Sequence, residues 1–208
     1  MPTWQLVDAD PIAAANPYTF YKPSRDLIAR IRPGETVKLI FRFDSNDPKA
    51  PSAERMWVLV EEVRSDGTFR GRLDNEPCYI ADLKIEDPID FKPCHIINTD
   101  HDDNDNLVER YIKRCFVTNR ILVDGKRVGY LYREEADEEN DSGWRLTAND
   151  ESEEYMSNPD NLAYVSLGAV LSNDDSFRDL LDSAVGSAFV RDEEAGSFVQ
   201  DAGDWCRD

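Results

Sequence analysis

A nine-residue segment near the middle of the chain contains no apolar residue, and this segment limits the fold more than any other feature. Residues 98–106 read Asn-Thr-Asp-His-Asp-Asp-Asn-Asp-Asn. Turn formers, acids and a histidine give a packed core nothing to bury, so we interpret the segment as exposed. The sequence therefore predicts two small domains, over residues 1–97 and 111–208, joined by an acidic linker over residues 98–110.

The first half has the pattern of an antiparallel sheet with one short helix. Residues 36–43, 56–63 and 68–73 are rich in β-branched and aromatic side chains, and the turn signal at residues 65–67 predicts a hairpin between the last two. Ser24 is placed to cap a helix over residues 25–31. Further edge strands are expected around residues 90–92 and 95–97, where two prolines keep the chain irregular.

The second half predicts a similar alternation of short elements. Residues 114–118 and 128–132 flank the turn pair Asp124-Gly125 and are interpreted as strand, turn and strand. Further strands are expected at residues 144–146 and 162–166, short helices at 150–156 behind Asp150 and at 177–181 behind Ser176, and a last hairpin from 187–190 and 197–199. Short helices among hairpin-connected strands indicate an α+β fold, with a mainly antiparallel sheet in each domain.

The net charge excludes one class of partner. The chain has 43 acidic and 24 basic residues, a net charge of −19. Nucleic acid binding requires a basic face that releases counterions from phosphates, so we expect no nucleic acid partner. Within residues 131–208 only five arginines oppose 21 acidic residues, which makes this part the expected electrostatic surface for a basic protein partner.

Several features predict a cytoplasmic protein with no membrane contact. Residues 1–8 lack the basic and apolar regions of a secretory signal. The longest apolar runs, such as residues 39–41, are far shorter than the roughly 20 residues that cross a bilayer. Cysteines at positions 78, 94, 115 and 206 are scattered, so reduced thiols are expected in place of a disulfide framework.

No motif predicts a metal or a cofactor. Residues 100–104 begin like a calcium loop, but Asp105 replaces the required glycine and Tyr111 replaces the closing glutamate. Cys78, Cys94, His95 and His101 are zinc-ligand types without the paired spacing of a zinc site. We therefore expect buried thiols, satisfied or exposed histidines and no bound metal.

Catalytic motifs are absent from the sequence as well. We find no nucleophile elbow, no phosphate-binding glycine loop and no kinase motifs. Carboxylate pairs such as Glu134-Glu135 and Glu153-Glu154 could serve acid–base chemistry only if burial pushed their pKa values apart. An enzyme using such carboxylates, a small hydrolase with or without a metal, stays the alternative to a binding protein.

Five blocks in the second half carry a resemblance to a known family. They are Cys115–Leu122, Val128–Glu135, Asp141–Arg145, Asp150–Met156 and Val185–Phe189. In this order they resemble the immunity protein 33-like family, also called domain of unknown function 2185, over about residues 111–200. The resemblance implies a bacterial protein that binds and neutralises a toxin, and it implies no catalytic residue. Thr147–Asn149 departs from the small or glycine-containing turn of that family.

The first half is similar to domain of unknown function 2314 over about residues 20–97. The residues that carry this similarity are Val37–Phe41, Ala53–Val58, Gly67–Gly71 and Leu73–Pro77. It implies no biochemical function.

These observations predict an acidic binding surface in the second half. Trp144 follows an acidic turn and precedes Arg145, so it is either a core residue or an interface anchor. Carboxylates are expected to supply the field, with Trp144, Arg145 and Tyr155 as candidate anchors. The expected partner-binding residues are Glu134, Glu135, Asp137, Glu138, Glu139, Asp141, Trp144, Arg145, Glu151, Glu153, Glu154 and Tyr155.

Overall fold

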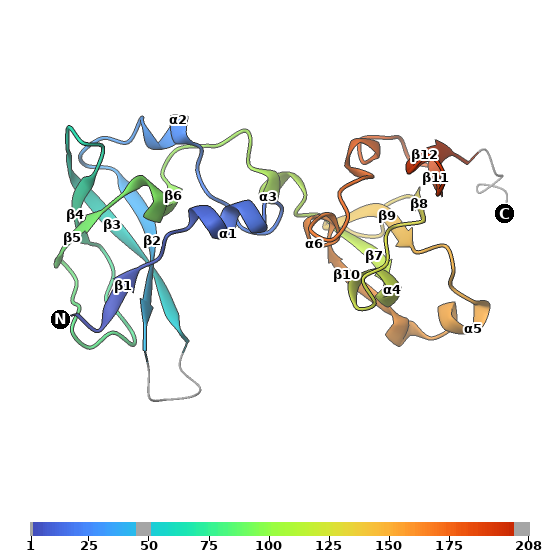
Figure 1. Ribbon diagram of the computed structural model, residues 1–208, viewed down its shortest axis with the longest axis horizontal. Coiled ribbons are helices and arrows are strands. Elements are labelled where there is room, and N and C mark those ends of the chain that lie inside the picture. Colours follow the sequence, from blue (N-terminus) through green and yellow to red (C-terminus); the bar gives the residue numbers. More distant parts are fainter. Residues whose placement is uncertain (1, 45–50, 202–208) are drawn as a thin grey trace. The chain divides into compact units, whose positions relative to one another are not determined.

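The computed structural model describes residues 2–44 and 51–201 and divides the chain into two compact units, residues 1–106 and 107–208 (Figure 1). In the described residues each unit is built on one six-stranded, mainly antiparallel sheet with short helices. The predicted α+β class is therefore confirmed. Cys206 lies outside the described residues.

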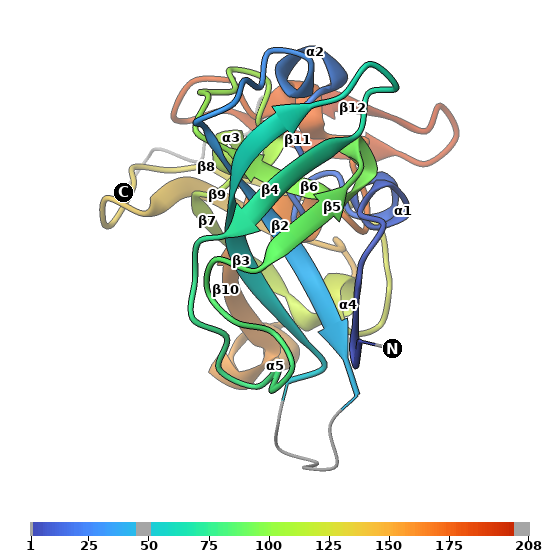
Figure 2. The same cartoon turned by 90° about the vertical axis from the view of Figure 1, so that its left-hand side faces the viewer.

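The N-terminal unit has the strand order β1-β2-β3-β4-β5, and β6 also pairs with β2 (Figure 2). All of these pairs are antiparallel. Its strands are β1 (Trp4–Leu6), β2 (Thr36–Phe43), β3 (Ala53–Val63), β4 (Phe69–Leu73), β5 (Pro88–Phe91) and β6 (Ile96–Thr99). Its helices are α1 (Asp10–Ala15), α2 (Arg25–Ile28) and the 3-10 turn η1 (Pro93–His95).

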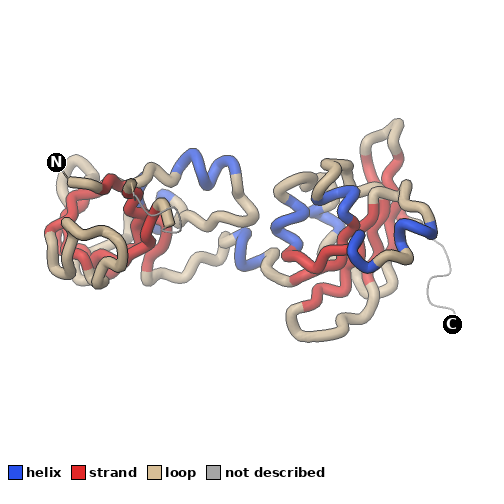
Figure 3. Tube along the Cα trace, turned by 90° about the horizontal axis from the view of Figure 1, so that it is seen from below, coloured by secondary structure: helices blue, strands red, loops and turns tan. Residues whose placement is uncertain are grey.

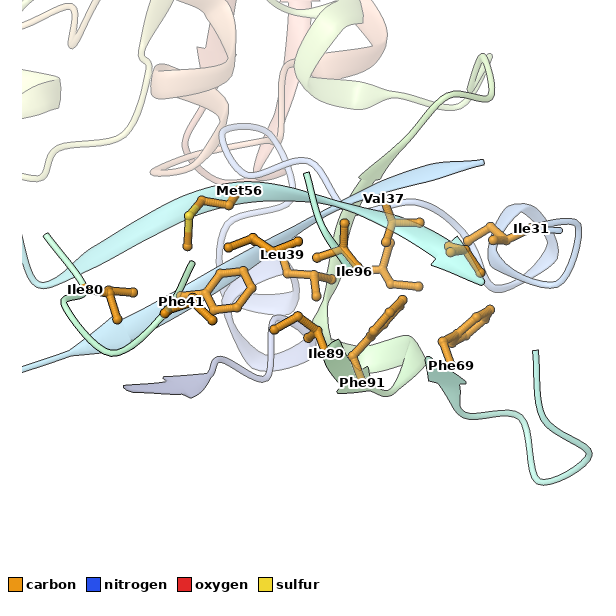
Figure 4. Close-up of a cluster of buried hydrophobic side chains, with 14 of the residues drawn as sticks. Ile31, Val37, Leu39, Phe41, Met56, Phe69, Ile80, Ile89, Phe91 and Ile96 are labelled. Carbon is orange, nitrogen blue, oxygen red and sulfur yellow. The ribbon is translucent and has the colours of Figure 1, made fainter. Parts of the chain in front are cut away.

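Alternation along β2 explains how this sheet acquires its core. Val37, Leu39 and Phe41 are fully buried on one face, where they meet residues of β3, β5 and β6 (Figure 4). Burial of an aliphatic or aromatic side chain stabilises the folded state by about 1.5–3 kcal/mol. Phe69 stacks on Phe91 with ring centroids 5.2 Å apart, which closes one end of the cluster.

Local signals fix the first helix and the first hairpin as expected. Ser24 Oγ accepts a hydrogen bond from the backbone N–H of Leu27 at 3.2 Å. The helix ends at Ile28 and not at residue 31, because the N–H groups of Arg30 and Ile31 bond carbonyls three residues back. Gly67 supplies the positive φ of 81° that the β3–β4 turn requires.

The C-terminal unit has the strand order β10-β7-β9-β8-β11-β12. Its strands are β7 (Arg114–Thr118), β8 (Tyr130–Arg133), β9 (Asp141–Thr147), β10 (Leu162–Ser166), β11 (Ala188–Asp192) and β12 (Ser197–Gln200). Its helices and 3-10 turns are α3 (Leu107–Arg110), α4 (Asn119–Leu122), α5 (Glu153–Met156), η2 (Pro159–Asn161), α6 (Leu167–Leu171) and η3 (Arg178–Leu180) (Figure 3). The expected strand at residues 162–166 and the last hairpin are confirmed.

Long-range pairing overturns one local interpretation. β7 and β8 do not form a hairpin, because β9 lies between them and pairs with β7 in parallel. The helix α4 begins immediately after Thr118 and carries the chain away from the sheet before β8 begins.

Two helix caps also differ from expectation. Ser152, in place of Asp150, caps α5, with its Oγ accepting the Tyr155 N–H at 3.1 Å. Ser176 does not cap the 3-10 turn η3, because its hydroxyl donates to Asp174 at 2.5 Å.

The acidic segment near residue 100 is bound to the N-terminal unit over much of its length. Residues 98 and 99 complete β6, and α3 begins at Leu107, so only residues 100–106 lie between regular elements. Asp100 Oδ2 accepts the Thr36 N–H at 2.8 Å, and the Tyr21 hydroxyl donates to Asp103 at 2.9 Å. The expected linker over residues 98–110 is therefore shorter in the structure, because some of its carboxylates bond backbone and hydroxyl groups of the first unit.

None of the helices in the part of the chain that the structure describes combines the length and the apolar character that crossing a membrane requires.

Limited proteolysis tests this boundary. We expect the first cut between Asn104 and Asn106, because the preceding residues are held by Thr36 and Tyr21. Two stable fragments should result, measured by mass spectrometry. Tyr21→Phe, which removes the bond to Asp103, should speed the cut, and first cuts inside residues 56–73 would contradict the boundary.

Candidate functional site

The structure separates the twelve expected partner-binding residues into three groups. Glu151 and Tyr155 are half-buried, and Asp141, Trp144 and Arg145 are buried. The exposed members are Glu134, Glu135, Asp137, Glu138, Glu139, Glu153 and Glu154.

Trp144 is a core residue, which decides between the two roles that the sequence left open and argues against an exposed anchor. Its side chain is 1% exposed, and its Nε1 donates to the carbonyl of Leu181 at 3.3 Å. The ring centroid lies 6.4 Å from that of Phe189. The reason is strand alternation on β9, which directs Trp144 and Leu146 to the covered face of the sheet.

Arg145 is also unavailable as an anchor, because it is enclosed by carboxylates. Its Nη1 and Nη2 donate to the two oxygens of Asp141, both at 2.9 Å. Its Nε donates to Glu134 at 2.5 Å, and Nη2 lies 3.4 Å from Asp137. Bidentate pairs of this kind are among the strongest charge-assisted hydrogen bonds in proteins.

The pair shifts the pKa values of both partners. The Arg145 guanidinium holds the pKa of Asp141 well below its usual range, helped by N–H groups of Asp137 and Gly143. Hydrogen bonding to Asp141, followed by contact with Glu134, raises the pKa of Arg145. Both groups are therefore ionised at any physiological pH, and they are not suited to proton transfer.

The same cluster fixes the acidic loop, which comprises residues 134–140. Asp141 accepts the Asp137 N–H at 3.1 Å, and the Glu134 N–H donates to the carbonyl of Gly143 at 2.9 Å. Gly143 has φ of 79°, and a Cβ there would lie 2.2 Å from the carbonyl oxygen of Glu134. Only glycine permits this close approach, so the loop is held at its start and near its middle.

The acidic loop and α5 adjoin opposite ends of β9. The loop precedes the first residue of β9, whereas α5 follows its last residue. Six steps along a strand separate these ends by about 20 Å. Glu151 is an internal ligand of this second end, since its carboxylate accepts the Thr118 hydroxyl at 2.5 Å and the Ala148 N–H at 2.8 Å. Tyr155 packs under the guanidinium of Arg120.

A row of aromatic side chains crosses the sheet beside the acidic loop. The register places Tyr164 of β10 opposite Phe116 of β7, Phe116 opposite Arg145 of β9, and Arg145 opposite Tyr132 of β8. We call these four residues the aromatic row. Phe116 is 37% exposed and both tyrosines are half-buried, while Cys115 and Val117, on the opposite face of β7, are fully buried.

Contacts within the aromatic row join it to the acidic loop. Phe116 stacks on Tyr164 with centroids 4.8 Å apart, and the Arg145 guanidinium lies 4.9 Å from the Phe116 ring. The Tyr164 hydroxyl donates to Glu138 at 2.8 Å. Desolvation and the Glu138 carboxylate raise the pKa of Tyr164 to about 12, so this hydroxyl remains a donor.

A hollow of about 250 Å³ adjoins the end of the aromatic row. Its lining includes Tyr132, the acidic residues Glu134 and Glu135, and the apolar residues Val185 and Ala188. This combination suits a basic or amphipathic side chain of a partner, because it offers both charge and apolar contact.

The sequence could have indicated Phe116 but not Tyr164. Buried Cys115 and Val117 in alternation imply an outward Phe116 once residues 114–118 are interpreted as a strand. Tyr164 lies on an edge strand whose residues are all half-buried, which leaves no inside–outside contrast.

The described side chains form no cluster of possible metal ligands. Among residues 2–44 and 51–201, no three His, Cys, Asp or Glu side chains converge as metal ligands. Burial raises the pKa of the Cys115 thiol to about 12, which disfavours a nucleophilic thiolate.

Comparison with known proteins identifies the region that contains this site. Residues 115–202 match the family model described as Immunity protein Imm33 domain. This part of the chain is therefore similar to the Imm33 domain. The resemblance of the second half to this family is thereby confirmed, and both the acidic loop and the aromatic row lie inside the matched residues. No curated protein and no solved structure matches the chain. The similarity of the first half to domain of unknown function 2314 stays a prediction.

Replacing the Asp141 carboxylate by an amide tests how much the buried pair contributes to stability. Asp141→Asn leaves the Arg145 charge without its bidentate partner and should lower the free energy of unfolding by about 3–5 kcal/mol at pH 7. The wild-type advantage should shrink as the pH falls below about 4, because the unfolded carboxyl protonates there while the folded one stays ionised. Urea unfolding at several pH values measures both effects.

The matched control for this variant is Glu135→Gln, which neutralises an exposed carboxylate of the same loop. A change below about 0.5 kcal/mol is expected there. Two outcomes would contradict the proposed importance of the pair: equal losses of unfolding free energy in the two variants, or a loss in Asp141→Asn that grows as the pH falls.

Proposed function

We propose that this chain is an immunity protein that neutralises a bacterial toxin in the cytoplasm by binding it and covering a basic surface. The observation that carries the proposal is the position of the aromatic row beside the acidic loop, inside the Imm33 domain. An immunity protein acts through a protein partner, and this surface has the composition of a binding site. No enzymatic step is required of it.

The aromatic row supports the contact part of the proposal. Interface energy concentrates in aromatic and arginine side chains that become desolvated on binding. Phe116 exposes 37% of its surface although it lies within a sheet, and its stack on Tyr164 fixes its orientation before any partner arrives. A preformed anchor costs little side-chain entropy when it binds.

The acidic loop supports the attraction part. Glu135 and Glu139 are exposed, and they lie in the half of the chain with the largest acidic surplus. Such a field accelerates encounter with a basic surface, and salt screens it over about 8 Å at physiological strength. Neutralisation would then follow from simple occlusion of the toxin.

A rescue experiment tests the function. The tagged chain is used to capture its partner from native cells at low salt, and the captured protein is expressed alone in a permissive host. We expect growth to stop, and co-expression of the chain should restore it. A partner whose expression leaves growth unchanged would contradict the toxin assignment.

Binding kinetics against that partner test the surface. Phe116→Ala should mainly raise the dissociation rate, by about 30-fold if the ring is a hot spot worth about 2 kcal/mol. Val123→Ala is the matched control. Val123 is an apolar residue that is 75% exposed, and it lies at the end of α4, outside the aromatic row. Its dissociation rate should be unchanged.

Charge reversal separates attraction from contact. Glu135→Lys with Glu139→Lys should lower the association rate and flatten its salt dependence, while the dissociation rate changes little. Reversal of Glu153 and Glu154, which lie in α5 beyond the other end of β9, should have a smaller effect. Equal effects of both double variants would contradict the assignment of the acidic loop. Circular dichroism verifies that each variant is folded.

A further inference from the structure

A cavity of about 420 Å³ lies in the N-terminal unit. It is lined by residues of α1, α2, the ends of β3 and β4, and η1. Its volume falls within the range of small-molecule sites, roughly 300–1,000 Å³. The question is which ligand chemistry its walls select.

Most of the wall is apolar and rigid. Ile28 and Phe69 are 5% and 3% exposed and belong to the main core of the unit, so their positions are fixed by packing. Figure 4 shows Phe69 beside Phe91, with which it stacks. Val63, by contrast, is 41% exposed at the end of β3. An exposed valine beside buried apolar residues marks apolar surface that a ligand could cover.

The charged groups of the cavity are not equivalent. Lys22 Nζ lies 3.2 Å from Asp10 Oδ1 and donates to the carbonyl of Pro93 at 3.2 Å, so its charge is already balanced. Arg25 also lines the cavity, but its guanidinium makes no ion pair with a carboxylate of the described residues. Among the described residues, the cavity therefore combines one cation that has no carboxylate partner with a mainly apolar wall.

We propose that this cavity binds a small amphipathic anion, with an apolar ring or chain against Ile28, Val63 and Phe69 and an acid group paired with Arg25. A carboxylate or sulfonate can accept two parallel hydrogen bonds from the planar guanidinium, which a neutral ligand cannot reproduce in the same way. The net charge of −19 disfavours anions elsewhere on the chain, so binding depends on this local cation. The proposal is independent of the toxin-binding function.

A pair of fluorescent probes with the same ring system tests the proposal on the full chain. 8-Anilinonaphthalene-1-sulfonate carries an anionic group, and N-phenyl-1-naphthylamine is its neutral counterpart. We expect the sulfonate to saturate at one molecule per chain and to bind more tightly than the neutral probe. Arg25→Gln should weaken the sulfonate by about tenfold and leave the neutral probe nearly unchanged.

Three variants control the assignment. Arg30→Gln removes an exposed arginine that does not line the cavity, and it should alter neither affinity. Val63→Trp should fill the cavity and abolish binding of both probes. Val185→Trp obstructs the hollow of the C-terminal unit and should leave both unchanged.

Methyl spectra of the unmodified protein provide a measurement that needs no variant. Titration with the sulfonate should shift the methyl signals of Ile28 and Val63 before any others. Binding that survives Val63→Trp in a folded protein, or shifts confined to other methyls, would overturn the site. Equal weakening by Arg25→Gln and Arg30→Gln would overturn the recognition of the anion.

Discussion

The buried ion pair of Asp141 and Arg145 holds the acidic loop and the aromatic row of the C-terminal unit in place. Two charges removed from water are tolerated only when their hydrogen bonds are nearly complete, and here Asp141 accepts from the guanidinium and from two backbone N–H groups. The same pair also positions the acidic loop. Because Glu134 and Asp137 also contact Arg145, the loop is bound at its start and middle, and its exposed carboxylates keep defined positions.

Phe116 connects this internal pair to the outside. One face of its ring covers the Arg145 guanidinium, and the remaining surface is exposed beside Tyr164. A cation beneath an aromatic ring is stabilised more strongly when it is desolvated. A partner that covered Phe116 would therefore exclude water from the pair as well. Under the proposed function, this one side chain would couple the stability of the buried pair to recognition of the partner.

The N-terminal unit uses different chemistry. Its core is aliphatic and aromatic, built from alternation along β2 and from the stacked pair Phe69 and Phe91. Its ion pairs lie near the surface, and such pairs contribute little to stability. What distinguishes this unit is a cavity that its packing leaves open, with Arg25 among the residues that line it. The C-terminal unit is thus characterised by the aromatic row and the acidic loop, and the N-terminal unit by its cavity.

Local features of the sequence were sufficient for the α+β class, the bounds of β2 and β10, the Ser24 cap, the last hairpin and the resemblance to the immunity family. Each depends on residues within a few positions of one another, through alternation, capping or turn chemistry. Tertiary structure alone decided that β9 separates β7 from β8, that Trp144 and Arg145 are buried, and that Tyr164 meets Phe116. The loop-closure cost of bringing two strands together changes slowly with their separation in sequence, so local pattern cannot select between distant partners, and the packing of the whole sheet makes that choice.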